Sequence, residues 1–343
     1  MSAIVTRFAT TADQPALIAF IHDHWSKTHV FVQAPEVFDW QYGQADGRLN
    51  MVLAEQDGSI LGVLGFIPLG RHDAALGDAD VLLALWKVRE AGVPPGVGLR
   101  LLKHIQSQLQ PRMIGAIGIS DMVGPIYKAL GYTLGKLTQA AIMIDTVTAR
   151  IAQGVPEFGA GVAGVQDYAL SDVTSDAVER LAAATVPRKS WAYVQDRYVN
   201  HPYYDYTLRL VRHAGQPVAA VIWRAVDRDG VRLLRIVDII GDTAWLSHGR
   251  ALLLPEVRAA GAEYIDLMQY GTDNAVLLAG GWISPDWVEG LMLPNYFAPF
   301  VAANVTIKLA FRRFIGSGPV RLYRADSDQD RPNLVPLPQR VQS

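Results

Sequence analysis

One order of expected elements occurs twice along this 343-residue chain, and the repetition limits the folds open to it. Each half reads as a hairpin, a strand, a helix, a strand, a short helix and a final strand. Residue identity between the halves is low, so the repeat is one of structure rather than of sequence. In the first half these runs lie at 50–69, 78–88, 99–109, 113–120, 121–132 and 137–145. In the second half they lie at 206–226, 231–242, 245–261, 262–271, 274–282 and 288–297.

Turn residues support both predicted hairpins. Asp57 and Gly58 separate two β-rich runs, and a type I′ turn needs positive φ at both central residues, which this pair tolerates. Ala214 and Gly215 stand between two similar runs in the second half. A strand is expected before the first hairpin at 3–9. Helices are expected at 10–25 and 176–185. Strands and helices therefore alternate along the chain, and this alternation predicts the α/β class.

The length of the chain favours two domains rather than one core. Half of the residues are hydrophobic and 19% are charged, which is enough apolar side chain to fill such cores. A glycine-rich stretch without periodicity separates the two repeats and predicts a linker. We therefore expect a first domain at 1–148, a linker at 149–168, a second domain at 169–325 and a flexible tail at 326–343.

Charge and composition exclude several classes of function. The formal net charge is −2, which provides no field to attract nucleic acid or an anionic membrane, so we expect neither partner. The chain has no cysteine, which rules out disulfides and thiolate metal sites. His22, His24 and His29 do not share one helical face, so no metal is expected. No apolar run is long enough to span a membrane, and the N-terminus lacks signal-peptide features, which together predict a cytoplasmic protein.

Two glycines lie just before the helix expected at 99–109, in the stretch Val93-Pro94-Pro95-Gly96-Val97-Gly98. The first amides of a helix have no partner within it and attract anions, aided by the helix dipole. Gly96 and Gly98 would let the backbone approach a phosphate without interference from a Cβ atom. The alternative is a tight strand-to-helix connection whose small residues serve packing, and the glycines alone do not decide between the two.

With this loop, the first half resembles the GNAT superfamily of acyl-CoA-dependent N-acyltransferases. The family pattern Gln/Arg-x-x-Gly-x-Gly/Ala falls on Val93 to Gly98, with valine in place of the leading Gln/Arg. The resemblance implies two domains with mixed, mostly antiparallel sheets flanked by helices, and acyl-CoA, most simply acetyl-CoA, as co-substrate. It further implies a sheet that splays between the strands at 78–88 and 113–120 to admit the thioester. The residues it assigns to acyl-CoA are Leu85, Trp86, Lys87, Val88, Val93, Pro95, Gly96, Val97, Gly98, Leu99 and Ser120.

A second family pattern, Tyr-x-x-x-Gly-Phe/Tyr, falls on Tyr127 to Tyr132. In the family this tyrosine often protonates the departing thiolate, so the resemblance gives Tyr127 the role of general acid. The alternative for Tyr127 is a helix tyrosine packed under the sheet. For the base, histidine has a suitable intrinsic pKa, which makes His24 and His29 candidates, with solvated histidines at a helix end as the alternative.

The second half looks like a degenerate copy of the first. Its strand at 231–242 is followed by one glycine, Gly249, among bulky residues, so we expect no acyl-CoA there. Together the halves resemble double-GNAT sugar N-acyltransferases of bacterial surface-polysaccharide pathways. Aromatic and polar loop residues, together with a polar residue in a strand, suit recognition of a polyhydroxyl ligand, although packing of the loops is an equal alternative. The candidate acceptor residues are Asp39, Trp40, Tyr42, His201, Tyr204, Gln269, Asn295 and Tyr296.

These observations predict an N-acyltransferase that moves an acyl group from acyl-CoA to the amino group of a nucleotide-linked amino sugar. The amine would attack directly, and an acyl carrier protein is an alternative donor. Two other functions remain open. One is a tandem-GNAT aminoacyl transferase of peptidoglycan precursors, which the negative net charge disfavours. The other is a non-catalytic binding module that kept the fold.

Overall fold

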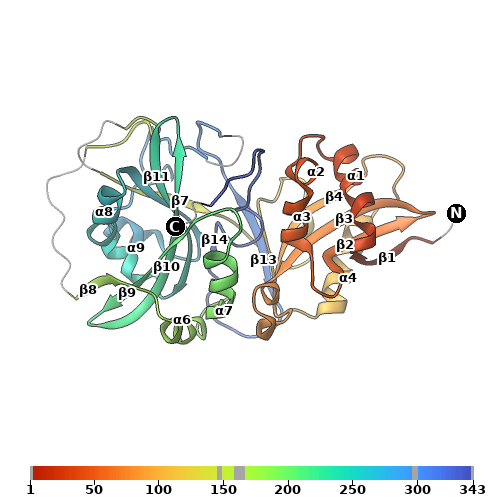
Figure 1. Ribbon diagram of the computed structural model, residues 1–343, viewed down its shortest axis with the longest axis horizontal. Coiled ribbons are helices and arrows are strands. Elements are labelled where there is room, and N and C mark those ends of the chain that lie inside the picture. Colours follow the sequence, from red (N-terminus) through yellow and green to blue (C-terminus); the bar gives the residue numbers. More distant parts are fainter. Residues whose placement is uncertain (1–2, 145–148, 158–166, 296–299, 341–343) are drawn as a thin grey trace. The chain divides into compact units, whose positions relative to one another are not determined.

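The protein is described by a computed structural model covering residues 3–144, 149–157, 167–295 and 300–340. Its contacts group the chain into two compact units (Figure 1). Unit 1 consists of the residues up to Leu134 together with Leu309–Gly316 and Ser327–Pro338. Unit 2 consists of Gly135–Lys308 and Ser317–Asp326, with the residues from Gln339 onward. Each unit contains a sheet flanked by helices, so the mixed α/β class expected from the sequence is confirmed.

The sheet of unit 1 has the order β1-β2-β3-β4-β5-β13-β6. Neighbours β1 to β4 pair antiparallel, β4 and β5 pair parallel, and β13 pairs antiparallel with β5. The strands are β1 (Val5–Thr10), β2 (Arg48–Gln56), β3 (Ser59–Pro68), β4 (Asp80–Val88), β5 (Met113–Ile117), β6 (Thr133–Lys136) and β13 (Lys308–Arg313). The helices are α1 (Gln14–His24), α2 (Val30–Gln33), α3 (Pro35–Tyr42), α4 (Val97–Leu109) and α5 (Gly124–Ala129).

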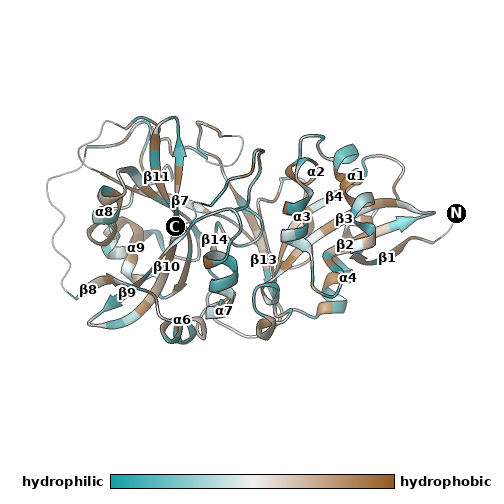
Figure 2. Cartoon of the chain, viewed as in Figure 1, coloured by the Kyte–Doolittle hydropathy of each residue, from teal (hydrophilic) through white to brown (hydrophobic). Residues whose placement is uncertain are grey.

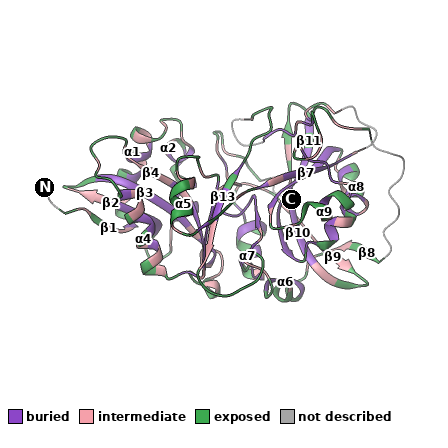
Figure 3. Ribbon diagram, turned by 180° about the vertical axis from the view of Figure 1, so that it is seen from behind, coloured by how far each residue is buried: buried purple, intermediate pink, exposed green. Residues whose placement is uncertain are grey.

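Both faces of the first sheet are covered. Val52 and Ala54 of β2 share a buried cluster with Leu101 and Ile105 of α4. Because side chains alternate along a strand, the equally buried Met51 and Leu53 face the other side, where α1 and α3 contact β3. In Figure 2 these helices carry both hydrophilic and hydrophobic segments, and Figure 3 shows strands β3 and β4 largely buried. Unit 1 therefore has apolar packing on both faces of the sheet around β2 to β5.

The sheet of unit 2 repeats the first in part. Its order is β14-β12-β11-β10-β9-β8, with β7 also paired to β12. As in unit 1, three antiparallel pairings lead to one parallel pair, here β11 with β12. The strands are β7 (Thr138–Met143), β8 (Tyr168–Ser171), β9 (Thr207–His213), β10 (Gln216–Arg228), β11 (Val231–Gly241), β12 (Ala262–Tyr270) and β14 (Leu322–Tyr323). The helices are α6 (Ser175–Ala182), α7 (Trp191–Val194), α8 (Gly249–Ala259) and α9 (Asn274–Ala279).

Two strands belong to the sheet of the other half of the chain. β7, from the first half, pairs antiparallel with β12, so that Ile142 lies opposite Ile265. β13, from the end of the chain, lies between β5 and β6 in the first sheet, where Ala310 lies opposite Ala116. The expectation that the strand at 137–145 closes the first sheet is therefore wrong: the strand forms, but its partner is in unit 2.

Most local predictions are confirmed. Both hairpin turns have two residues with positive φ, 52° and 74° at Asp57 and Gly58 and 48° and 77° at Ala214 and Gly215. The strand expected at 288–297 is wrong over its described part. There the chain makes only isolated bridges, such as Met292 with Gln153. The strands β6, β8, β13 and β14 had no sequence prediction.

The two units divide the chain differently from the predicted domains at 1–148 and 169–325, because segments after residue 308 belong to unit 1. Part of the tail expected to be flexible, Ser327–Pro338, also belongs to unit 1, and Ser327 and Asp330 are buried. Of the expected linker at 149–168, residues 158–166 lie outside the described part of the chain. The domain boundaries remain a prediction.

Candidate active site

The glycine-containing loop ends at a helix, as predicted. Gly96 is the N-cap of α4 with φ 88°, a left-handed conformation that favours glycine. A Cβ atom on Gly96 would meet nothing within 4 Å, so the space above this residue is open. The first amides of α4, those of Val97, Gly98 and Leu99, have no acceptor within a helix that begins there. The loop therefore has the open backbone donors that a diphosphate requires.

Strands β4 and β5 diverge beside this loop. Their parallel pairing runs from Asp80 with Met113 to Leu83 with Ala116 and stops there. β4 continues to Val88 and keeps its pairing with β3, so the Ala84–Val88 stretch has a strand partner on one edge only among the described residues. The splay implied by the resemblance is present at the expected strands. It joins Leu85, Trp86, Lys87 and Val88 to the glycine loop at the end of β4.

Tyr127 lies on α5 and points into the core. Its side chain is 1% exposed, and its ring meets the indole of Trp86 edge to face at 5.7 Å between centroids. Burial, together with the neighbouring Tyr132, raises the pKa of the Tyr127 hydroxyl above its ordinary value. The outer side of α5 is exposed in Figure 3. The structure thus places Tyr127 against β4 in its protonated form, consistent with either packing or proton donation.

The two candidate bases have different surroundings. His29 caps α2, and its Nδ1 accepts a hydrogen bond from the amide of Phe31 at 3.2 Å. Burial, with a contribution from the charge of Arg331, lowers the pKa of His29 to about 4. The imidazole is therefore neutral at pH 7 but only weakly basic. His24, at the end of α1, packs its ring on Phe20 at 4.8 Å and is partly exposed.

The segment after residue 326 reaches the point where β4 and β5 diverge. The hydroxyl of Ser327 donates to the carbonyl of Leu83 at 2.6 Å. Leu83 is the last residue of β4 that pairs with β5. The amide of Gln329 donates to the carbonyl of Ile117 at 3.4 Å, at the end of β5. Sequence reasoning missed both residues, because a polar, proline-containing run at the end of a chain has no periodicity to signal packing.

Buried polar groups surround this segment. Arg331 lies over the ring of Phe31 at 4.6 Å and pairs with Asp328 at 3.6 Å. Burial raises the pKa of Tyr42, and the negative charge of Asp328 adds to the effect. The Tyr42 hydroxyl and the amide of Gln41 are buried without a hydrogen bond of good geometry to any described residue. Buried polar atoms of this kind are costly unless a ligand or water satisfies them.

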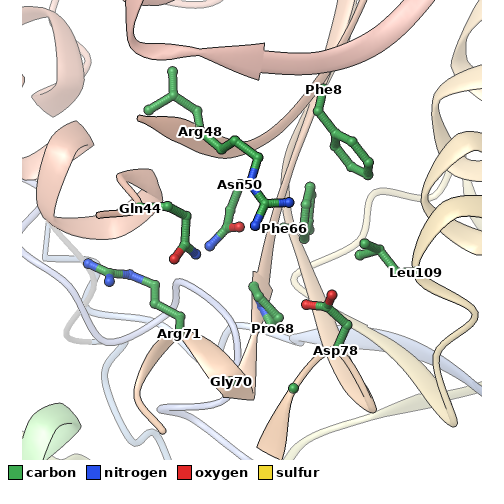
Figure 4. Close-up of a pocket in the computed structure, with 12 residues that line it drawn as sticks. Phe8, Gln44, Arg48, Asn50, Phe66, Pro68, Gly70, Arg71, Asp78 and Leu109 are labelled. Atoms are coloured by element: carbon green, nitrogen blue, oxygen red, sulfur yellow. The ribbon is translucent and has the colours of Figure 1, made fainter. Parts of the chain in front are cut away.

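Among the candidate acceptor residues of unit 1, only Tyr42 joins this group. Asp39 is exposed on α3 and Trp40 is half-buried, whereas Tyr42 is fully buried on the same helix. A cavity of about 170 Å³ exists in unit 1 but lies elsewhere, where Phe8, Phe66 and Leu109 line it together with the polar residues Arg48, Asn50 and Asp78 (Figure 4). Asp78 precedes β4, at the opposite end of that strand from the glycine loop. None of the predicted site residues lines this cavity.

The sheet of unit 2 diverges in the same way, but its own chain occupies the gap. The parallel pairing of β11 and β12 ends at Ile236 and Leu267. At the next residue of β11, the carbonyl of Val237 accepts from the amide of Ala325 at 3.0 Å. β14 pairs with the last residues of β12. Gly249, the one glycine at the start of α8, serves packing, because a Cβ atom there would overlap the indole of Trp282.

A buried charge cluster lies beside this second gap. Lys189 contacts Asp238 at 2.5 Å and Asp326 at 2.9 Å, and the hydroxyl of Tyr198 donates to Asp238 at 2.6 Å. Burial opposes the charge of Lys189, but the two carboxylates outweigh it and raise its pKa. Burial raises the pKa of Asp326 to about 6, against the pull of Lys189. The cluster fixes the chain at Asp326.

The acceptor candidates of unit 2 mostly have local partners. The Nδ1 of His201 accepts from the amides of Tyr203 and Tyr204, and its ring stacks on Tyr204 at 5.1 Å. The guanidinium of Arg224 lies over the ring of Tyr204, 4.1 Å from its centroid. Gln269 bonds at both ends of its amide to the backbone of Thr272, which closes a turn. Asn295 is buried and bridges to Val301. Tyr296 lies outside the described residues.

No group of three or more acidic residues or histidines is arranged to hold a metal ion in the described part of the chain. Within the same residues, no helix has the length and apolar character needed to cross a membrane.

Solved structures share this fold at low sequence identity. A GCN5-related N-acetyltransferase from Anabaena variabilis ATCC 29413 superposes with a TM-score of 0.55 and 12% identity, covering 91% of this chain and 73% of that one. A GCN5-related N-acetyltransferase from Kribbella flavida gives 0.51 and 10%, covering 91% and 71%. The sequence matches no protein-family model. No curated protein matches it either. The chain therefore has the fold of the GCN5-related N-acetyltransferases, the GNAT fold.

Proposed function

We propose that the protein is an N-acyltransferase that moves a short acyl group from acyl-CoA to the amino group of a nucleotide-linked amino sugar. One observation carries the proposal: an open glycine N-cap at α4 adjoins a stretch of β4 that has lost its β5 partner. The loop offers backbone donors to a diphosphate, and the free edge of β4 offers backbone groups to the amide-containing arm that follows it.

The residues around the splay fit the chemistry that the thioester requires. A bound thioester supplies the activated acyl group. The backbone amides of Ala84–Val88 on the free edge of β4 would polarise its carbonyl, with the amide near Val88 as the first candidate. Tyr127, kept protonated by burial, would donate a proton to the departing thiolate. The Nδ1 of His29 is taken by the Phe31 amide, so His24, partly exposed at the end of α1, is the candidate that would accept a proton from the incoming amine.

A polar acceptor is supported by two buried polar groups of unit 1 that lack a hydrogen bond of good geometry to any described residue. The hydroxyl of Tyr42 and the amide of Gln41 lie buried near Asp328 and the backbone of Leu85. We further propose that unit 2 does not bind acyl-CoA, because its corresponding gap holds Ala325 and β14.

Binding of coenzyme A tests the donor half directly. A hundredfold excess over its Kd adds about 2.7 kcal/mol to the free energy of unfolding, which a melting curve detects. We expect Gly98→Glu to abolish this gain, because it adds a negative charge beside the first amides of α4 and its Cβ atom would lie 3.3 Å from the Trp86 indole. Ser107→Glu places the same charge at an exposed site further along α4 and should retain the gain. No stabilisation of the unmodified protein would favour a non-catalytic binding module.

Transfer itself is tested by release of free thiol from acetyl-CoA in the presence of nucleotide-linked amino sugars. We expect release above the hydrolysis background with at least one such sugar, and a product with the mass of its N-acetyl derivative. Release that depends on simple amines but on none of the sugars would retain the N-acyltransferase and reject the acceptor class.

A further inference from the structure

We propose that Ser327, Asp328 and Gln329 form the closed end of the acyl slot and restrict the enzyme to short acyl groups. The inference rests on the proposed function and adds a specificity determinant to it. It assigns a role to a part of the chain for which the sequence predicts only a flexible tail.

The geometry of β4 sets where the slot ends. The glycine loop follows Val88, and the pairing with β5 resumes at Leu83. The Ala84–Val88 stretch between them spans roughly 16 Å at about 3.3 Å per residue. A donor whose diphosphate lies at the loop and whose arm follows β4 must therefore point its acyl end toward Leu83.

Residues from the end of the chain occupy that position. Ser327 bonds to the carbonyl of Leu83 on one strand, and Gln329 bonds to the carbonyl of Ile117 on the other. Gly118 permits this approach, because a Cβ atom on it would lie 2.9 Å from the Gln329 amide nitrogen. The segment thus spans the point of divergence and attaches to both strands.

The closed end of the slot, here called the wall, is also polar. Gln329 also donates to Asp328, whose other oxygen pairs with Arg331. An alkyl chain reaching this end would strip water from a carboxylate and an amide without replacing their hydrogen bonds, which is unfavourable. Short acyl groups stop before the wall, and longer ones must displace it.

The test measures binding of coenzyme A, acetyl-CoA, butyryl-CoA and octanoyl-CoA to the full-length protein by calorimetry. For the unmodified protein we expect affinity to be highest for acetyl-CoA and to fall for the two longer chains. Gln329→Ala should raise the affinity for butyryl-CoA relative to acetyl-CoA by up to about sixteenfold, since each of the two additional methylenes that gains an apolar site contributes about fourfold. Gln339→Ala makes the same change at an exposed site of the same tail and should leave the ratio unchanged.

The outcomes separate the two proposals. If coenzyme A itself does not bind, the proposed function fails and this inference fails with it. If coenzyme A binds and affinity rises steadily with chain length in the unmodified protein, only the inference is overturned, and no variant is needed to show it. An unchanged butyryl-to-acetyl ratio in a folded Gln329→Ala protein overturns it as well.

Discussion

Trp86 of β4 and Tyr127 of α5 meet edge to face, with ring centroids 5.7 Å apart and planes inclined at 74°. The contact holds Tyr127 against the strand expected to carry the thioester. The same burial keeps its hydroxyl protonated at neutral pH. These two facts make a specific kinetic prediction for Tyr127.

Tyr127→Phe retains the ring and removes the hydroxyl. If Tyr127 donates the proton, we expect kcat to fall by about a hundredfold or more, while the affinity for acetyl-CoA stays within about twofold. Steady-state kinetics and calorimetry on the same preparation measure the two quantities. Equal losses in turnover and in donor affinity would instead identify a packing residue.

His29 predicts a pH dependence of stability. Its pKa is about 4 in the folded chain and 6.5 as an ordinary value, so the unfolded chain binds more protons between these pH values. The free energy of unfolding should therefore rise with pH across that window. His29→Asn keeps a side chain able to cap α2 and removes the titrating ring, so this part of the slope should disappear.

Urea unfolding at pH 4.5, 5.5, 6.5 and 7.5 measures the slope. The value at pH 7.5, above the window, corrects for lost ring packing. A slope that is identical in both proteins would show that His29 is not held neutral by its surroundings.

Gly96 predicts a backbone cost. Alanine at its φ of 88° should lower the free energy of unfolding by about 1–2 kcal/mol. Gly124→Ala is a matched control, because Gly124 begins α5 at an ordinary φ and a methyl there meets nothing within 4 Å. Denaturant melts of both variants give the comparison, and equal effects would argue against the left-handed N-cap.

Lys189 predicts a large loss of stability. Lys189→Met leaves the buried carboxylates of Asp238 and Asp326 without their cation, which typically costs about 3–5 kcal/mol. Lys136→Met removes a partly exposed pair with Asp286 and should cost less than about 1 kcal/mol. Similar melting temperatures for the two variants would contradict the placement of Lys189.

Local sequence signals predicted the parts of the fold that local physics determines. Asp57-Gly58 fixes a turn by its own φ values, and Gly96 and Gly98 precede a helix whose apolar spacing is visible in the sequence. The loop, the neighbouring strand and the tyrosine helix followed from these signals and from the family resemblance.

Long-range pairing could not be predicted in this way. β7 has the apolar composition of a buried strand, but nothing in its residues distinguishes β5 from β12 as a neighbour. β13 is short and ends in two arginines, and it pairs with a strand about 190 residues earlier in the chain. Ser327 and Gln329 lie in a polar run that becomes ordered by bonding to carbonyls left free where two strands diverge.

The exchange of β7 and β13 has a consequence for synthesis on the ribosome. The place between β5 and β6 stays vacant until residues 308–313 have left the exit tunnel, so the first sheet cannot be completed while the chain is growing. A gene cut between the two repeats would leave the first fragment without β13 and the second fragment without β7. Neither fragment should fold alone, whereas co-expression of the two should restore a complex that purifies as one species.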